Sequence, residues 1–231
     1  MYKRQGKTTV GRTILKLIPA TQGRVLFAGN DVLASTGPRL RRLRRDMQII
    51  FQDPAGSLNP RMRIASIVGE PLLVHGLISS KDQLRAEAEK LLERCGMPRA
   101  AADRYPHEFS GGQRQRIGIA RALALQPKFI VCDEPTSALD VSIQAQIINL
   151  LTDLQREFGL SYLFISHSMS VIQHVCKDIA VMYRGKIVEH GPREQIIENP
   201  QHPYTQSLLS AVPETDPRRK KQRVVFAGGA M

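Results

Sequence analysis

The chain has 231 residues, 42% of them hydrophobic and 23% charged, which suits one globular domain with a sizeable core. No apolar run approaches the roughly 18 residues of a membrane-spanning helix, the N-terminus lacks the pattern of a secretion signal, and three widely spaced cysteines fit a reducing compartment better than a disulfide framework or metal site. The net charge of +12, concentrated in residues 39–45 and 218–221, would suit a nucleotide, a nucleic acid or an anionic membrane, although such runs are more often solvated helix faces and tails.

The N-terminal part is predicted to alternate helix and strand. A loop at Gly6 leads into a helix that runs to about Leu17. Residues 24–28, followed by Gly-Asn-Asp, indicate a strand and a turn, and residues 47–51 form a short apolar strand.

The middle of the chain is predicted to be helical. Residues 64–95 carry apolar residues at helical spacing, and Gly96 is placed to end that pattern. A further helix is expected from Ser110 to about Gln126, before a proline.

The C-terminal half alternates again. Residues 129–133 form a nearly all-apolar strand, as expected for a parallel sheet covered on both faces. A helix over 143–158, a strand over 162–166 and a hairpin over 179–189 follow. The fold class is therefore α/β, with a helical insertion between Gln52 and Ser110.

Three short segments carry candidate chemistry. Gly6-Lys7-Thr8-Thr9 matches the end of a phosphate-binding loop, in which backbone N–H groups and the lysine bind phosphates and the hydroxyl binds Mg²⁺. The first glycine of that motif should stand where Met1 is, so this signal is weak by itself, and a chance Gly-Lys-Thr before a helix is an equal alternative.

The second segment ends the apolar strand 129–133. Asp133 there could hold Mg²⁺, and Glu134 could polarise an attacking water molecule. The alternative is that both carboxylates only terminate a strand.

The third segment is Ser110-Gly111-Gly112-Gln113. Two glycines at a helix start let backbone N–H groups approach an anion, and Ser110 can cap the helix and donate to phosphate.

With these residues in order, the chain from Gly6 to about Pro213 resembles the ATPase subunits of ATP-binding cassette (ABC) transporters. Ser110–Gln113 matches the family signature and Asp133-Glu134 its Walker B end. Three further matches are the Q-loop, the D-loop and the switch histidine, at Gln52, Asp140 and His167.

The resemblance implies a P-loop NTPase fold: a RecA-like core with a parallel sheet, plus a helical signature subdomain. Its expected parts are residues 1–59 (partial core), 60–126 (signature subdomain), 127–192 (rest of the core) and 193–231 (C-terminal tail). The N-terminal strands of relatives are missing here, and Met1–Gln5 does not match the phosphate loop, so we expect a truncated gene product that lacks activity alone.

The resemblance also implies a mechanism in which two cassettes sandwich two ATP molecules. Lys7 would neutralise phosphate charge, Thr8 and Asp133 would hold Mg²⁺, and Gln52 would sense it. Glu134 would act as general base and His167 would contact the γ-phosphate. The remaining nucleotide-site residues would be Gly6, Thr9, Asp140 and the signature Ser110, Gly111, Gly112 and Gln113 of the partner cassette.

Residues 53–60 and 199–205 resemble the dipeptide, oligopeptide, nickel and glutathione importers. This implies import of small peptides at the cytoplasmic face of the bacterial inner membrane, with permease subunits, a second cassette (identical, different or fused) and, indirectly, a substrate-binding protein as partners. No nucleic acid is expected, and no iron–sulfur cluster, because no cysteine follows Cys176. Ser168 stands where relatives usually have aspartate.

One rival remains open: a soluble ABC ATPase that acts on ribosomes or DNA, which the positive charge would suit. DNA-repair relatives need a long coiled coil, and residues 52–110 show no sustained heptads. Ribosome-acting relatives usually lack the His202-Pro-Tyr-Thr205 tail. Co-purification with permeases or with ribosomes would separate the two.

Overall fold

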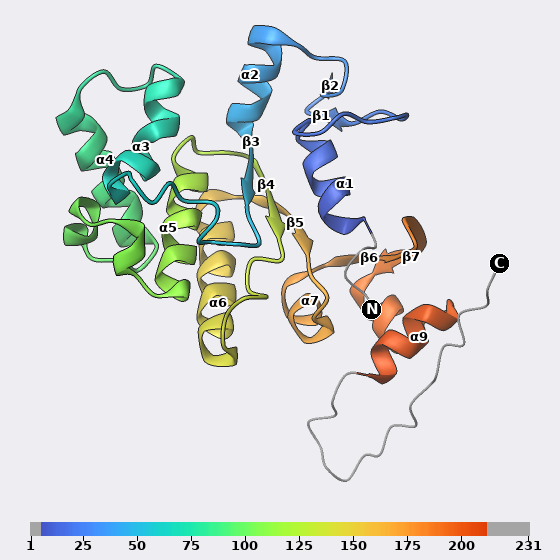
Figure 1. The fold of residues 1–231 in the computed structure, drawn as a ribbon. Coiled ribbons are helices and arrows are strands. Elements are labelled where there is room, and N and C mark those ends of the chain that lie inside the picture. Colours follow the sequence, from blue (N-terminus) through green and yellow to red (C-terminus); the bar gives the residue numbers. More distant parts are fainter. Residues whose placement is uncertain (1–5, 212–231) are drawn as a thin grey trace. The chain divides into compact units, whose positions relative to one another are not determined.

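The computed structural model describes residues 6–211, which fall into two compact units. Residues 8–165 make the larger unit, and residues 6–7 with 166–211 make the smaller one. Figure 1 gives the order of the elements along the chain. Within residues 6–211, no helix combines the length and apolarity needed to cross a membrane.

A parallel sheet organises the larger unit. Its strands are β3 (Met47–Ile50), β4 (Phe129–Asp133) and β5 (Ser161–Ile165), in the order β3-β4-β5. The registers pair Ile49 with Val131 and Val131 with Leu163. The central strand β4 is almost wholly buried, which explains its continuous apolar sequence. The predicted α/β class with a parallel sheet is confirmed.

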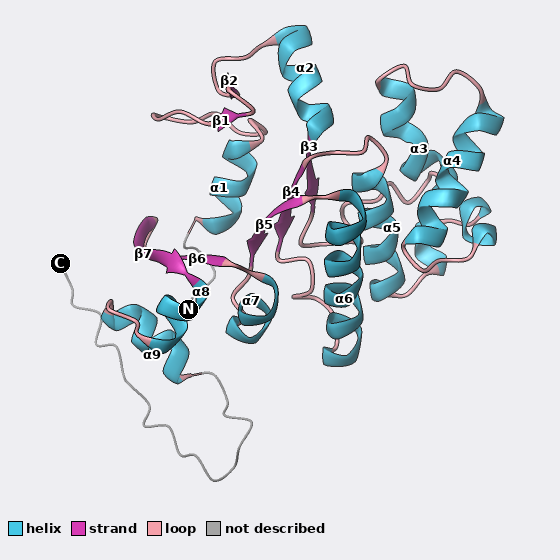
Figure 2. Cartoon of the chain, turned by 180° about the vertical axis from the view of Figure 1, so that it is seen from behind, coloured by secondary structure: helices cyan, strands magenta, loops and turns pink. Residues whose placement is uncertain are grey.

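Helices cover both faces of this sheet (Figure 2). Because side chains alternate along a strand, Val131 joins the cluster beside α1 (Lys7–Ile14), whereas Ile130 and Cys132 join the cluster of α5 and α6. Helix α1 packs closely: a Cβ on Gly11 would stand 2.9 Å from Val131 Cγ1. The middle of α1 is thereby held against the sheet.

Three α-helices and two short 3-10 turns form the helical part of this unit. They are α3 (Ile64–Val74), α4 (Lys81–Arg94), η1 (Arg99–Asp103), η2 (Pro106–Glu108) and α5 (Gly111–Leu123). The predicted helical stretch 64–95 is thus two helices, divided at Gly76, which has a φ of +67°. Gly96 (φ +72°) follows the end of α4 as predicted, and α5 ends three residues before the expected Gln126.

The remaining elements of the larger unit are short except for α6 (Val141–Phe158). The predicted strand at 24–28 is reduced to β1 (Leu26–Phe27), paired with β2 (Asn30–Asp31). The basic run lies on α2 (Gly37–Asp46), a helix whose Leu40 and Leu43 belong to the core.

The smaller unit contains the predicted hairpin, β6 (Asp178–Tyr183) and β7 (Lys186–Pro192). It also contains α7 (Met169–Val175), α8 (Arg193–Glu198) and α9 (Pro203–Ser210). Glu189 of β7 accepts hydrogen bonds from the backbone N–H of Gln201 (2.7 Å) and His202 (3.1 Å). The His202-Pro-Tyr-Thr205 segment is therefore tied to the hairpin.

The predicted domain limits at residues 59, 126 and 192 stay predictions. The described residues exclude 1–5 and 212–231. The basic run 218–221 and the C-terminal part of the predicted tail therefore lie outside them.

Candidate active site

The first part of the candidate site joins the start of α1 to the end of β4. Thr8 Oγ1 donates a hydrogen bond to Asp133 Oδ1 at 2.9 Å. Asp133 is only 1% exposed, so its carboxylate stands at the base of the site and not on the surface. Two residues 125 positions apart in the chain are thereby brought together.

The donor set of this pair fits Mg²⁺. That ion prefers oxygen ligands and commonly binds through one or two protein groups, with waters and substrate phosphates completing its octahedron. A hydroxyl and a carboxylate supply such oxygens. The described residues contain no group of three or more His, Cys, Asp and Glu side chains that could hold a metal by themselves.

The second part joins Gln52 and Glu134. Gln52 Nε2, in the loop after β3, donates to Glu134 Oε2 at 2.9 Å. Glu134 has a φ of +47°, a left-handed conformation that costs a residue with a Cβ about 1–2 kcal/mol. Its backbone N–H donates to Ile165 O of the adjacent strand at 2.9 Å, which holds that conformation. Glu134 is therefore held in position by hydrogen bonds at both its backbone N–H and its carboxylate.

The predicted signature residues form the first turn of α5. Ser110 Oγ accepts from the N–H of Gln113 (3.3 Å), and Gln113 Oε1 accepts from the N–H of Ser110 (3.0 Å). This reciprocal pair is a capping box, and it leaves the hydroxyl proton of Ser110 available as a donor. Ser110, Gly111 and Gln113 are exposed, so this helix start is accessible to an anion.

The two glycines of the signature have different roles. A Cβ on Gly112 would lie 2.5 Å from Ile143 Cγ2 of α6, so any side chain there would force the two helices apart. A Cβ on Gly111 would make only an ordinary 3.5 Å contact with Leu139. Gly112 is therefore needed for helix packing, whereas Gly111 leaves the exposed surface of the turn open.

Asp140 caps the helix that Gly112 contacts. Its Oδ1 accepts from the N–H of Ile143 at 3.0 Å, at the start of α6. The signature turn and the D-loop residue thus meet on the same first turn of α6. The geometry assigns Asp140 a structural role beside its predicted place in the nucleotide site.

The other predicted residues belong to the smaller unit or to the rest of the first turn of α1. Lys7 Nζ donates to Ser166 O at 3.3 Å, and Ser166 directly precedes the exposed His167. Gly6 has a φ of +84°, which suits a glycine at the end of a phosphate loop. Thr9 is exposed, and its carbonyl accepts from Thr13 Oγ1 at 2.8 Å, a bond within the helix.

The sequence analysis missed Arg121, on the last turn of α5. Arg121 Nη1 donates to Ser57 O at 2.6 Å, and its guanidinium lies 5.9 Å from the ring of Phe51, the neighbour of Gln52. Burial lowers the pKa of Arg121, although the charge of Glu70 raises it. A single arginine within the otherwise apolar run 117–125 was the available signal. Arg121 ties the loop that carries Gln52 to the signature helix.

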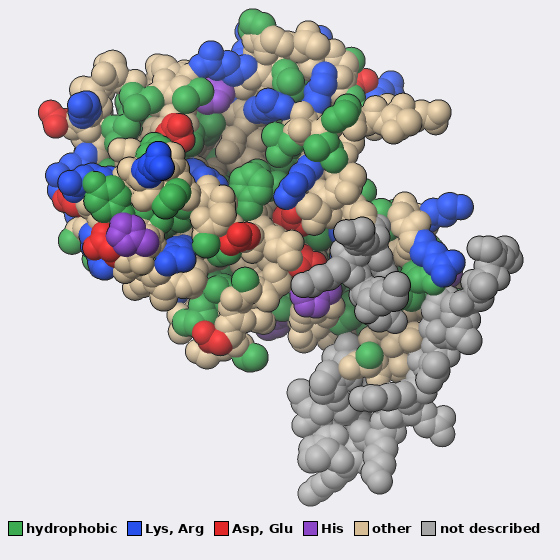
Figure 3. Space-filling view, in the orientation of Figure 1, with side chains coloured by type: hydrophobic (Ala, Val, Ile, Leu, Met, Phe, Trp, Pro, Cys, Tyr) green, Lys and Arg blue, Asp and Glu red, His purple; other side chains and the backbone are tan. Residues whose placement is uncertain are grey.

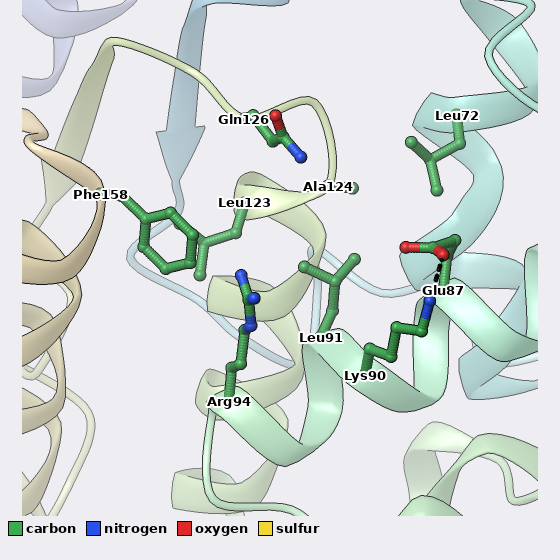
Figure 4. Close-up of a pocket in the computed structure, with 9 residues that line it drawn as sticks. All are labelled: Leu72, Glu87, Lys90, Leu91, Arg94, Leu123, Ala124, Gln126 and Phe158. Carbon is green, nitrogen blue, oxygen red and sulfur yellow. Dashed lines mark hydrogen bonds and ion pairs between the residues drawn. The ribbon is translucent and has the colours of Figure 1, made fainter.

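A hollow elsewhere on the larger unit is separate from these groups. It has a volume of about 220 Å³, and an adjoining hollow of about 430 Å³ shares Arg94 and Phe158 with it. Figure 4 shows side chains of α3, α4, α5 and α6 around it, with Lys90 paired to Glu87. None of its lining residues is a predicted site residue. The candidate active site, at the ends of β3 and β4, therefore does not coincide with this hollow.

Comparison with known proteins gives two family matches. Residues 5–137 match the family described as ABC transporter, and residues 188–228 match the oligopeptide/dipeptide transporter C-terminal region. The first match covers more than half of the chain.

Curated relatives agree with both matches. The chain is 56% identical over 223 residues to the glutathione import ATP-binding protein GsiA of Escherichia coli, covering 96% of this chain and 36% of that protein. It is 54% identical over 220 residues to the oligopeptide transport ATP-binding protein OppF of Bacillus subtilis, covering 95% of this chain and 72% of that protein. The chain thus spans about a third of the length of its GsiA relatives.

Solved structures share the fold. The ATP-binding cassette MJ0796, determined as a dimer in a post-hydrolysis state with ADP and Pi, superposes with a TM-score of 0.73 at 29% identity, covering 82% of this chain and 81% of that one. The cbiO1 protein of Clostridium perfringens, part of the cbiONQ ABC transporter complex, gives 0.74 at 26% identity, covering 86% and 77%.

Proposed function

The chain belongs to the ABC transporter ATPases, in the oligopeptide/dipeptide branch, as its motifs predicted, and from this premise we propose that it is the ATP-hydrolysing part of an importer of small peptides or glutathione. The observation that carries the hydrolytic part is the pairing at the end of β4. Asp133 accepts from Thr8 and the adjacent Glu134 accepts from Gln52, each at 2.9 Å. One carboxylate suited to bind a metal and one positioned carboxylate therefore lie on the consecutive residues Asp133 and Glu134.

The chain's own residues divide the work of hydrolysis. Lys7 and the N–H groups at the start of α1 bind the phosphates of ATP, since cations and helix N-termini attract anions. Thr8 and Asp133 would hold Mg²⁺, which when bound would neutralise charge on the β- and γ-phosphates. Gln52, in the loop after β3, would sense the bound metal.

Glu134 acts as the general base. Its carboxylate accepts a proton from the water that attacks the γ-phosphorus, and the hydrogen bond from Gln52 keeps it in place until substrate enters. The left-handed backbone at Glu134 supports this role, because strained conformations are retained where function requires a fixed side chain. The family resemblance assigns His167 a contact with the γ-phosphate.

A second cassette completes each site. The exposed turn Ser110–Gln113 presents backbone N–H groups and a hydroxyl to the ATP held by the partner. The dimer of MJ0796 with ADP and Pi supports this arrangement by similarity. ATP then favours the closed dimer, and hydrolysis releases it.

The transport assignment rests on the relatives and on the C-terminal region. GsiA is named for glutathione import and OppF for oligopeptide transport. We assign the chain the same class of cargo, with permease subunits as membrane partners and a binding protein as the indirect source of cargo. Its place is the cytoplasmic face of the bacterial inner membrane.

The test is Glu134→Gln, measured as phosphate release and nucleotide binding in the variant and in the unsubstituted protein. The substitution keeps the size and the hydrogen bond to Gln52 but removes the base, so turnover should fall at least about 100-fold while Mg-ATP still binds. Unchanged turnover would refute the role of Glu134.

A further inference from the structure

Helix α5 carries three arginines whose contacts differ from those of the surface arginines around it. Figure 3 shows Lys and Arg side chains interspersed with Asp and Glu on the side where α3, α4 and α5 lie. On α4, the exposed Arg85 pairs in this way with Glu89 (2.8 Å) and Asp103 (2.6 Å). The arginines of α5 are half-buried and donate to backbone carbonyls of three separate segments: Arg114 to Pro106 O (2.9 Å), Arg116 to Cys95 O (2.9 Å) and Arg121 to Ser57 O (2.6 Å).

Two of these arginines lie on the same side of α5. Arg114 and Arg121 are seven positions apart, which is close to two helical turns and separates them by about 10 Å along the axis. Arg114 holds the segment directly before the signature turn, because it also donates to His107 O at 3.5 Å. Arg121 holds the loop that carries Gln52. One side of the helix is therefore bonded to both segments.

The Gln52 loop is closed around Asp53 and forms a single turn. Asp53 O accepts from the N–H of Ser57 at 3.1 Å, and Asp53 Oδ1 accepts from the N–H of Ala55 at 2.9 Å. Gln52 directly precedes this turn and donates to Glu134. A bond at Ser57 O therefore fixes the turn from which Gln52 reaches the candidate general base.

The burial of Arg121 has a free-energy cost that an apolar residue would not have. Burial lowers the pKa of its guanidinium, although the charge of Glu70 raises it. The neighbouring positions of α5 are filled by buried apolar residues, so the core itself needs no charge there. The partners that offset the cost are Ser57 O and the ring of Phe51, and both belong to the segment that carries Gln52. The arginine at this position therefore serves the loop.

We propose that Arg121 is a positioning residue for ATP hydrolysis. With Arg114, it makes α5 a rigid link between the Gln52 loop, which serves the ATP of this chain, and the signature turn, which serves the ATP of the partner cassette. This role rests on the proposed function, in which each ATP lies between two cassettes. A shift of the Gln52 loop at one site is carried to the signature turn at the other, so the two sites bind ATP cooperatively.

The first test is phosphate release by Arg121→Met, measured well below the Tm of that variant. The kcat should fall about tenfold or more, because a displacement of about 1 Å in a positioned group can cost about 100-fold. The KM for ATP should change less than about twofold, since Lys7 and the start of α1 bind the phosphates and lie outside the turn that Arg121 holds. The Hill coefficient for ATP should fall toward 1. Arg121→Lys keeps an N–H donor for Ser57 O and should recover most of the lost kcat.

Arg116→Met is the matched control on the same helix. Arg116 is also half-buried and also donates to a backbone carbonyl, but it lies on another side of α5 and holds the end of α4. Its replacement should lower stability, as that of Arg121 does, yet leave kcat within about twofold of the unsubstituted protein. Circular dichroism checks that each variant is folded, and Arg121→Gln replaces Arg121→Met if that variant is not.

The second test needs no nucleotide. Hydrogen exchange is followed by mass spectrometry in peptides that contain Ser57, whose N–H bonds to Asp53 O, and in peptides that contain Gln113, whose N–H bonds to Ser110 Oγ. Arg121→Met should speed exchange roughly fivefold in the Ser57 peptides, and it should also speed exchange in the Gln113 peptides because the link transmits the loss. Arg116→Met should leave the Ser57 peptides unchanged.

Three results would overturn the proposal. They are an unchanged kcat in Arg121→Met, an equal loss of kcat in Arg116→Met, and faster exchange at Ser57 without any change at Gln113. If the unsubstituted protein releases no phosphate, the proposed function fails by itself. The exchange measurement still decides in that case whether Arg121 links the Gln52 loop to the signature turn.

Discussion

Replacing Arg121 with methionine removes the link between the signature helix and the loop that carries Gln52. The side chain keeps most of its length but loses the hydrogen bond to Ser57 O (2.6 Å) and the contact with Phe51. A hydrogen bond from a charged group is worth about 1.5–3 kcal/mol, and methionine leaves the Ser57 carbonyl without this donor. Methionine also removes the free-energy cost of burying a charged guanidinium, and this offsets part of that loss. We expect a net destabilisation of about 2 kcal/mol.

The assay is thermal unfolding followed by far-ultraviolet circular dichroism. For a domain of this size, about 2 kcal/mol corresponds to a fall in Tm of roughly 4–8 °C. Arg156→Met, on the exposed surface of α6, is the matched control and should shift Tm by about 1 °C or less. An Arg121→Met protein as stable as this control would refute the reasoning.

A fluorescence measurement tests the loop directly. The chain has no tryptophan, so Phe51→Trp introduces a single reporter next to Gln52. Adding Arg121→Met should shift its emission to longer wavelength, because the loop loses its anchor and the ring becomes more solvated. An unchanged spectrum would mean that the loop holds its place without Arg121.

Two further substitutions test other parts of the structure. Gly112→Val should push α5 away from α6, because the added Cβ would stand 2.5 Å from Ile143 Cγ2. In a denaturant titration it should lower the free energy of unfolding by about 1–3 kcal/mol. Gly111→Val should lower it clearly less. Glu189→Gln should destabilise the attachment of the segment before α9. Desolvation raises the pKa of Glu189, but the hydrogen bonds from the N–H groups of Gln201 and His202, together with the charge of His202, outweigh it and leave that pKa below the ordinary 4.5. The native state therefore favours the charged form of Glu189. The stability that this carboxylate contributes is complete above pH 4.5 and is lost as pH falls through the depressed native pKa. The Tm difference between wild type and Glu189→Gln should shrink over that acidic window. A difference that grew on acidification would contradict this sign.

The sequence by itself determined the local features. The nearly all-apolar run 129–133 predicted a buried strand of a covered sheet, and the structure has β4 at those residues. Ser110 and Gly96 marked a helix start and a helix end, because capping depends on a few neighbouring residues. The ordered motifs likewise sufficed for the family, which the matches confirm.

Only the tertiary structure decided which distant groups meet. Thr8 reaches Asp133, and Gln52 reaches Glu134, because the parallel register of β3, β4 and β5 brings their ends to one edge. Arg121 and Gly112 acquired roles through helix packing, which no local pattern encodes. Local hydrogen bonds and hydrophobic periodicity are written in adjacent residues, whereas contacts across a hundred positions depend on how whole elements pack.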